Sequence, residues 1–207
     1  MKKILSGIIT LIIVVIVILN PFRSDKPEPV TPESQETNSL VVAFEKEEIP
    51  DNCFVRNFAS DSVDEYCYVC ALTKEEAKEE EIPASFTVND YEIMVIVEEE
   101  SYSSCDEVAA YLYYFEELPI NYITKTKAKK LGWVAEKGNL WDVTDHMSIG
   151  GGGFNNNEGI LPDGTKYYEC DIDYNGGTRN GLRIVYSQDG AIYYSSDHYR
   201  NFILIYE

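Results

Sequence analysis

Four side chains near the carboxyl terminus have the chemistry needed to break a phosphodiester bond. Glu169 lies in a stretch of alternating apolar and acidic residues, Arg179 and Arg183 follow closely, and His198 comes later. A carboxylate can take a proton from a hydroxyl group, and an imidazole can give one to a leaving oxygen. Two guanidiniums can hold a phosphate and the negative charge that develops on it. This set can transfer a phosphodiester without a metal, and RNA supplies its own nucleophile, the 2′-hydroxyl.

An antiparallel sheet is predicted to position these side chains. Residues 168–174 alternate apolar and acidic side chains, which predicts a strand with its acids on one face. Those acids are Glu169, Asp171 and Asp173, and we expect Asp171 to be a buried ion-pair partner of the arginines. Residues 182–187 predict a second strand with Arg183 on one face and apolar side chains on the other. Further strands are expected near 191–194 and 201–206.

Helices are predicted before this sheet. Residues 106–117 carry apolar side chains at helical spacing, and Asp106 is the expected cap. Thr124 is expected to cap the segment KTKAKKL, which Gly132 terminates. The glycine run 150–153 is expected to be a flexible loop, because no strand–glycine–helix pattern surrounds it. Helices followed by an antiparallel sheet predict an α+β domain.

Residues 105–207 resemble the barnase-like bacterial guanyl-preferring ribonucleases. The resemblance rests on the segments LPINYITKTKAKKLGWVAEKGNLWDV, SIGG, ECDIDY and SSDHY, which stand in the family's order and spacing. It implies the microbial ribonuclease fold, with helices at the amino end of the domain packed on an antiparallel β-sheet. It says nothing about residues 25–104.

The resemblance also implies roles for the residues of the predicted site. Glu169 matches the general base and His198 the general acid. Lys125, Arg179 and Arg183 match the cations around the cleaved phosphate. The implied reaction is endonucleolytic cleavage of single-stranded RNA to a 2′,3′-cyclic phosphate that is hydrolysed later, with no metal and no cofactor.

A loop before the catalytic strand matches the family's guanine-binding segment. Its backbone N–H groups would meet O6 of the base, while Glu158 accepts hydrogen bonds from N1 and N2. Two positions depart from the family pattern: Asn157 replaces an arginine and Gly152 replaces an aspartate. The loss of a cation near the substrate is expected to weaken phosphate attraction and leaves the strength of guanine preference open. The expected substrate-binding residues are Phe154, Asn155, Asn156, Asn157, Glu158 and Tyr199.

Five cysteines are present, and an exported chain makes disulfides the first interpretation. The candidates are Cys53, Cys67, Cys70, Cys105 and Cys170. Cys105 and Cys170 fall on apolar faces that the family fold packs together, so a bond between them is one hypothesis. Cys67-x-x-Cys70 could instead be half of a zinc site, but the other half is missing, so no metal is predicted. The odd number leaves one thiol free or intermolecular.

The amino terminus predicts a membrane segment. Lys2 and Lys3 precede an uncharged apolar run from Ile4 to Leu19, and Asn20-Pro21 then ends any helix. We favour an uncleaved anchor over residues 1–20, with a cleaved signal peptide as the alternative. The lysines place the amino end inside and the rest of the chain outside the membrane. Residues 21–39 are proline-rich and predict an extended linker.

Residues 40–104 predict a small acidic α+β module of unknown function. Residues 66–71 predict a strand, Thr73 and Glu76 a capping box that starts a helix to about Glu81, and residues 86–97 a hairpin. Residues 25–106 hold 22 acidic and five basic side chains, while the whole chain has a net charge of −19. This excludes a broad basic surface for nucleic acid. The acidic half could restrain the cationic site or could simply be a solvated spacer.

Three classes of function fit these features. The first is an exported, membrane-tethered endoribonuclease that acts on RNA as a monomer. The second is a delivered ribonuclease toxin, and the third is a non-catalytic module that binds RNA or an inhibitor on the same fold. An acidic, barstar-like protein inhibitor is a possible partner. The intact set of Glu169, Arg183 and His198 favours an enzyme over a binding module.

Overall fold

The computed structural model describes residues 39–45, 49–56, 67–79, 82–89 and 91–207. The predicted membrane segment over residues 1–20, and the linker as far as residue 38, lie outside these residues. Within the described ranges, every helix is too short or too polar to cross a bilayer.

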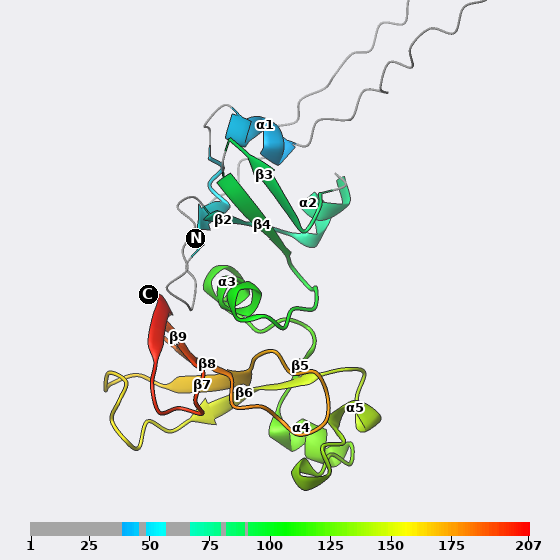
Figure 1. The fold of residues 1–207 in the computed structure, drawn as a ribbon, viewed down its shortest axis with the longest axis vertical. Helices are drawn as coiled ribbons and strands as arrows, with labels where there is room; N and C mark the ends of the chain where they lie inside the picture. Colours follow the sequence, from blue (N-terminus) through cyan, green and yellow to red (C-terminus); the bar gives the residue numbers. More distant parts are fainter. Residues whose placement is uncertain (1–38, 46–48, 57–66, 80–81, 90) are drawn as a thin grey trace, which may run out of the picture. The chain divides into compact units, whose positions relative to one another are not determined.

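A six-stranded sheet forms the carboxyl-terminal half of the described chain (Figure 1). Its spatial order is β10-β9-β8-β7-β6-β5. All neighbouring strands are antiparallel except β5 and β6, which are parallel. The prediction of a purely antiparallel sheet is therefore wrong for this pair. The strands are β5 (Tyr122–Ile123), β6 (Ser148–Phe154), β7 (Tyr167–Asp171), β8 (Arg183–Ser187), β9 (Ile192–Ser195) and β10 (Ile203–Tyr206).

Helix α3 (Cys105–Phe115) covers one face of this sheet. Val108, Ala109 and Leu112 pack on Cys170 and Ile184 in a core of buried apolar side chains. The cap of this helix is Ser104 and not the predicted Asp106. Ser104 accepts from the backbone N–H of Glu107, and the Glu107 carboxylate accepts in return from Ser104. This capping box satisfies two N–H groups, which Asp106, one residue inside the helix, does not do.

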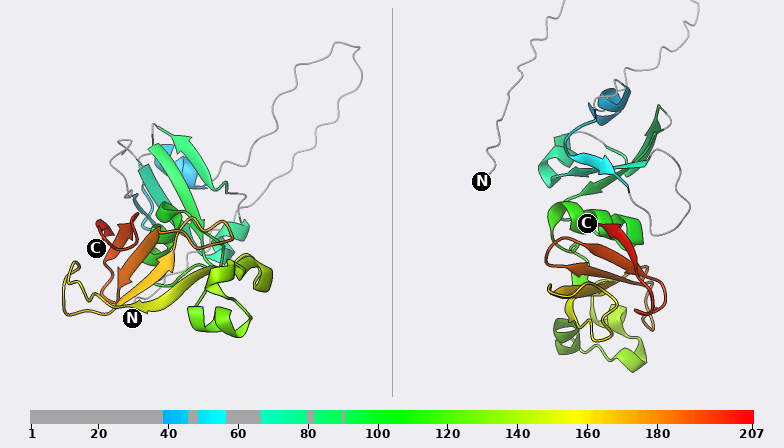
Figure 2. Two further views of the ribbon diagram at one scale, coloured as in Figure 1. Left: turned by 60° about the horizontal axis from the view of Figure 1, so that its bottom comes forward. Right: turned by 90° about the vertical axis from the view of Figure 1, so that its left-hand side faces the viewer.

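Shorter helices lie at the β5 end of the sheet (Figure 2). Thr124 caps α4 (Lys125–Lys130), as predicted, by accepting from the backbone N–H of Lys127. The turn η1 (Ala135–Lys137) and α5 (Leu140–Val143) follow. A second core joins these elements to the sheet through Ala128, Trp133, Leu140, Ile149 and Tyr174. This packing fixes the start of α4, where Lys125 stands.

A separate four-stranded sheet precedes α3, in the order β1-β2-β4-β3. Strands β2 and β4 are parallel, while β3 and β4 form the predicted antiparallel hairpin. Thr73 and Glu76 form the predicted capping box at the start of the second helix of this region. The elements are α1 (Ser39–Glu45), β1 (Cys53–Val55), β2 (Cys67–Leu72), α2 (Lys74–Glu79), β3 (Ser85–Val88) and β4 (Tyr91–Val97).

Helix α3 also packs on this second sheet, so it is buried on two sides. Ala110 and Tyr111 are fully buried against Val69 and Ile96. The Tyr111 hydroxyl accepts a hydrogen bond from the backbone N–H of Glu99. Because the same helix belongs to two apolar cores, the acidic region is packed onto the carboxyl-terminal half and is not only a solvated spacer.

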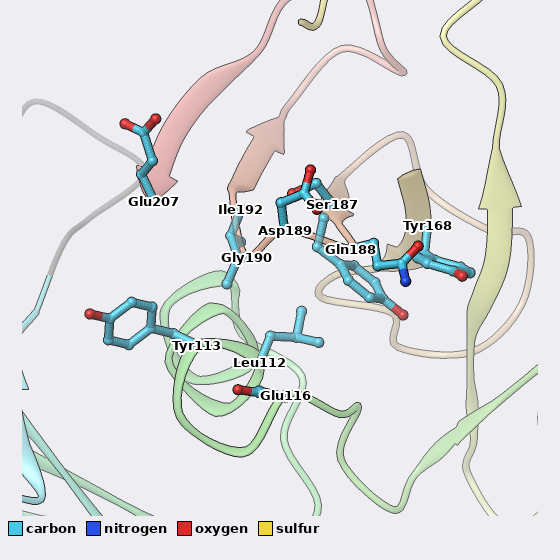
Figure 3. A pocket seen from close by; sticks show the side chains of 11 residues that line it. Leu112, Tyr113, Glu116, Tyr168, Ser187, Gln188, Asp189, Gly190, Ile192 and Glu207 are labelled. Carbon is cyan, nitrogen blue, oxygen red and sulfur yellow. The ribbon is translucent and has the colours of Figure 1, made fainter. Parts of the chain in front are cut away.

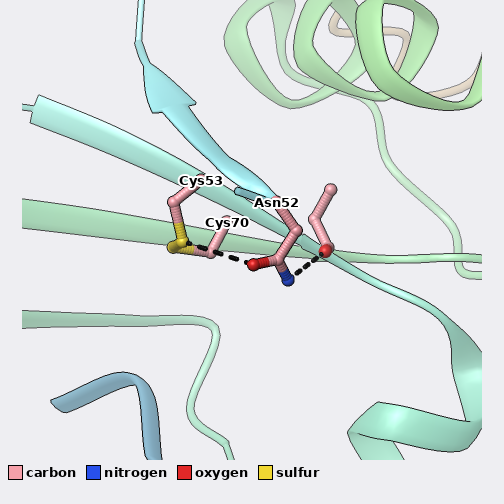
Figure 4. The surroundings of a disulfide bond; sticks show 4 residues. Asn52, Cys53 and Cys70 are labelled. Atoms are coloured by element: carbon pink, nitrogen blue, oxygen red, sulfur yellow. Dashed lines mark hydrogen bonds between the residues drawn. A yellow bond between two sulfur atoms is a disulfide. The ribbon is translucent and has the colours of Figure 1, made fainter. Parts of the chain in front are cut away.

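One disulfide joins Cys53 to Cys70, and it links the edge strand β1 to β2 (Figure 4). The two cysteines are direct partners across this antiparallel pair, and Asn52 beside them donates to the carbonyl of Ala71. Cys105 and Cys170 are free thiols, so the predicted bond between them is wrong. They share a core but remain reduced there, and burial raises the pKa of both thiols. Because Cys70 is bonded to Cys53, it cannot also be a zinc ligand, which excludes the zinc site considered for Cys67 and Cys70.

The glycine run predicted to be a flexible loop is part of strand β6. Gly150 pairs with Cys170, and a Cβ atom there would lie 2.6 Å from Cδ1 of Tyr122. Glycine therefore permits the close approach of side chains from the neighbouring strands. The register shifts between Gly150 and Gly152, where Gly151 has a φ of +74°. This irregularity is typical of a β-bulge.

Candidate active site

The face of the sheet opposite α3 carries the acidic and basic side chains of the predicted site. Residues paired across neighbouring strands point to the same face, and Asp171 pairs with Arg183. Glu169 lies two residues earlier on β7 and therefore shares this face. Asp173 does not belong to it, because β7 ends at Asp171 and Asp173 has a φ of 52° and is exposed. Glu169 and Asp171 therefore share this face as predicted, and the prediction that Asp173 shares it is wrong.

Glu169 is buried and accepts hydrogen bonds from two sides. Lys125 Nζ lies 2.6 Å from Oε1, and the Tyr199 hydroxyl donates to Oε2. Burial by itself raises the pKa of Glu169, but the hydrogen bonds from Lys125 and Tyr199 outweigh it and hold this pKa below its usual value. The carboxylate is therefore ionised, and its oxygens are fixed in direction.

Tyr199 joins this carboxylate to the guanidinium of Arg183. Arg183 Nε donates to the Tyr199 hydroxyl over 3.1 Å, and the hydroxyl donates in turn to Glu169. Burial and the neighbouring Glu169 raise the pKa of Tyr199, so the phenol keeps its proton. Lys125, Glu169, Tyr199 and Arg183 thus form one continuous hydrogen-bonded chain, which we call the Glu169 network.

Asp171 anchors both arginines of the predicted site, as expected. Its carboxylate is fully buried, with Arg183 Nε 3.0 Å away and Arg179 bound through two nitrogens. Burial lowers the pKa of Arg179, but the bond to Asp171 outweighs it and the net shift is upward. Arg183 is only 2% exposed, and it also donates to the carbonyl of Leu182 and the amide oxygen of Asn180. The guanidiniums are therefore fixed in place before any ligand binds.

His198 stands beside the network on the turn between β9 and β10. Its ring centroid lies 4.7 Å from that of Tyr199, and its side chain is exposed. His198 and Tyr199 have φ values of 59° and 74°, which a non-glycine residue adopts only when its surroundings hold it. Asp197 supplies that support, because its carboxylate accepts from the backbone N–H groups of Arg200 and Asn201.

The loop after β6 borders a cavity of about 320 Å³. Asn156 holds this loop closed, since its side chain donates to the carbonyl of Leu161 and accepts from the N–H of the same residue. The ring of Phe154 lies 5.2 Å from that of Tyr199, and both rings line this cavity. The cavity joins the predicted guanine loop to the histidine turn; its lining includes Phe154, Asn155, Asn156, Asn157, Glu158, His198 and Tyr199.

Comparison with known proteins decides the family of this half of the chain. A family model described as ribonuclease matches residues 106–206. A ribonuclease of Heyndrickxia coagulans is 52% identical over 102 residues, which are 48% of this chain and 94% of that relative. The chain belongs to this ribonuclease family.

Two further relatives extend the comparison. Ribonucleases of Bacillus intermedius and Bacillus pumilus are each 52% identical to the chain over 102 residues, which are 48% of this chain and 63% of each relative. Residues 106–206 are therefore a barnase-like ribonuclease domain, which confirms the resemblance seen in the sequence.

Several residues that position the site were not singled out from the sequence. Asn180 orients Arg183, while Ser195 and Asp197 hold the turn that carries His198. Asp197 could have been recognised, because an aspartate directly before a functional turn residue commonly accepts from the backbone N–H groups that follow it. Asn180 and Ser195 also bind residues within four positions of themselves, but a single asparagine or serine in a turn does not by itself indicate such a role.

A cavity of about 470 Å³ lies apart from the Glu169 network in the ribonuclease domain (Figure 3). It opens between the end of α3 and the turn that joins β8 to β9. Leu112, Tyr113, Glu116 and Asp189 contribute to its walls. None of the predicted site residues lines it, so its size does not make it the candidate active site.

Proposed function

We propose that the ribonuclease domain is an endoribonuclease that cleaves single-stranded RNA by transphosphorylation. Glu169 takes the proton of a ribose 2′-hydroxyl, and the 2′-oxygen attacks the neighbouring phosphorus. The bond from phosphorus to the 5′-oxygen of the next nucleoside breaks, and His198 gives a proton to that leaving oxygen. The products are a 2′,3′-cyclic phosphate and a free 5′-hydroxyl.

The fixed cations supply the remaining stabilisation. Negative charge grows on the non-bridging oxygens during attack, and guanidiniums that are already oriented bind it without reorganising. Arg183 and Arg179 are held by Asp171, and Lys125 lies beside Glu169. In the second step a water molecule replaces the leaving group and the cyclic ester opens. Glu169 and His198 then exchange their acid and base roles.

Guanine preference is assigned to the loop after β6. Glu158 is exposed beside the cavity that Phe154 and Tyr199 border, so it can accept two parallel hydrogen bonds from N1 and N2 of guanine. The aromatic side chains offer apolar surface to the base. Asn157, where the family pattern has arginine, brings no charge to this loop.

The observation that carries the proposal is the Glu169 network. It combines an ionised carboxylate, a lysine and a buried arginine in fixed hydrogen bonds, with an exposed histidine on the adjoining turn. A module that only binds RNA has no need of a carboxylate among its phosphate-binding cations, because that carboxylate repels phosphate. A general base is the simplest use for it.

We also propose that the enzyme acts outside the cytoplasm. The disulfide between Cys53 and Cys70 supports this, because such bonds persist mainly in oxidising compartments. The apolar run from Ile4 to Leu19 supports export as well.

Cleavage of the dinucleotides GpC and ApC by the purified soluble chain, residues 25–207, tests both parts of the proposal. We expect GpC to be cleaved faster, and Glu158→Gln to reduce that preference. Equal rates for both dinucleotides would reject guanine preference, while no cleavage of either would reject the enzyme.

A further inference from the structure

Arg200 lies on the wall of the cavity that also holds Glu158 and Phe154. It follows His198 and Tyr199 on the same turn and is exposed. The cations of the predicted site, Lys125, Arg179 and Arg183, do not line this cavity. Arg200 therefore brings a permanent positive charge to the side of the site where the base is expected to bind.

The guanidinium of Arg200 is not engaged by any described part of the chain. Among the described arginines, Arg56 pairs with Asp106, and Arg179 and Arg183 pair with Asp171. Within the described ranges, Arg200 makes a hydrogen bond through its backbone N–H, which donates to Asp197, and not through its guanidinium. The ribonuclease domain carries more acidic than basic side chains, so an arginine that stays unpaired there is available for an external anion.

The turn holds Arg200 in place although its side chain is free. Asp197 accepts from the N–H groups of Arg200 and Asn201 and from the Asn201 side chain, and these bonds lower the pKa of Asp197. Tyr199, the preceding residue, is tied to Glu169 and Arg183. The backbone of Arg200 is thus anchored on both sides, so that only its side chain has to be ordered on binding.

We propose that Arg200 binds the phosphate on the 5′ side of the guanosine, one nucleotide before the cleaved linkage. The inference rests on the proposed function, because it assumes that the cavity holds the base and that the cleaved phosphate lies at the Glu169 network. A guanidinium fork matches two phosphate oxygens, and the neighbouring cations already serve the cleaved phosphate. Arg200 thus supplies a cation to the base side of the site, where the loop itself has Asn157.

Three substrates test this assignment: GpC has only the cleaved phosphate, ApGpC adds one on the 5′ side, and GpCpA adds one on the 3′ side. We expect Arg200→Gln to lower kcat/KM for ApGpC about tenfold, the effect of losing one charged hydrogen bond. Rates for GpC and GpCpA should not change. For ApGpC the dependence of log kcat/KM on log salt should become shallower by about 0.7, as one lost phosphate contact predicts.

Lys137→Gln is the matched control, because it removes one exposed positive charge from η1, away from the cavity lining. It should leave all three rates unchanged, and Arg200→Lys should keep part of the ApGpC rate. An equal loss on GpC would overturn the proposal by placing Arg200 at the reacting phosphate, and a loss only on GpCpA would place it on the other side. Failure of the wild-type chain to cleave GpC would instead reject the proposed function.

Discussion

Glu169 remains ionised in a buried place because Lys125 and Tyr199 both donate to it. Burial disfavours the charged form of a carboxyl group, and direct hydrogen bonds favour it. Here the hydrogen bonds outweigh burial and the pKa of Glu169 is lowered. A general base must be deprotonated before it acts, so the low pKa extends the proposed activity toward acid pH.

Lys125→Met should therefore move the acidic limb of the pH–rate profile to higher pH. Without the lysine, burial acts on Glu169 with less opposition and its pKa rises. The check is kcat/KM for GpC as a function of pH. Lys127→Met, an exposed substitution on the same helix, should leave the limb in place. An acidic limb that shifts equally in both variants, or in neither, would contradict the role given to Lys125.

Strand β6 places the predicted guanine loop at the edge of the sheet face that carries Glu169. Its glycines let Tyr122, Leu118 and Cys170 close over the strand, because no side chain stands between them. Protein interiors tolerate added volume poorly when backbone and ring atoms surround it. The position of the loop therefore depends on residues that carry no chemistry.

Gly150→Ala should destabilise the protein by about 1–3 kcal/mol, the usual cost of overpacking. The new Cβ would meet Cδ1 of Tyr122 at 2.6 Å and Cβ of Cys170 at 2.9 Å. Gly153→Ala in the same strand is the control, since nothing lies within 4 Å of its Cβ position. The free energy of unfolding in urea measures both. Equal effects of the two substitutions would contradict the packing account.

The sequence predicted strands β7 and β8, the Thr124 cap and the ion pairs of Asp171, because each leaves a local pattern. It did not predict β6, since glycines weaken every strand signal and only the packing around Gly150 explains them. It also missed the partner of Cys70. That pairing depends on the register of β1 against β2, which is a property of tertiary structure. The chain of bonds through Tyr199 was likewise hidden, because Tyr199 is thirty positions from Glu169.

Across the whole molecule, the acidic region contacts the ribonuclease domain away from the Glu169 network. The described contacts join Val69 and Ile96 to α3, Phe54 to Tyr206, and Arg56 to Asp106. None of these partners belongs to the predicted site. Within the described part of the chain, the acidic region therefore acts as a support for α3 and gives no evidence of covering the cationic groups.

Removal of the acidic region should lower stability and leave the chemistry unchanged. A chain of residues 101–207 keeps the Ser104 cap but exposes Ala110 and Tyr111. Exposure of one aromatic side chain that was fully buried lowers the free energy of unfolding by about 2 kcal/mol. Thermal unfolding and GpC cleavage compare this chain with residues 25–207. Higher activity of the short chain, increasing as salt is lowered, would instead favour electrostatic restraint by the acidic region.

The central claim is that Glu169 takes a proton from the 2′-hydroxyl next to the cleaved phosphodiester and that His198 gives a proton to its leaving 5′-oxygen. Its most direct test is the product formed from GpC by residues 25–207, followed by chromatography. We predict guanosine 2′,3′-cyclic phosphate and cytidine, with the rate lowered about 100-fold or more in Glu169→Gln and in His198→Ala, and unchanged in Asp173→Asn. A linear 3′-phosphate as the first product, or full activity in Glu169→Gln, would contradict the account.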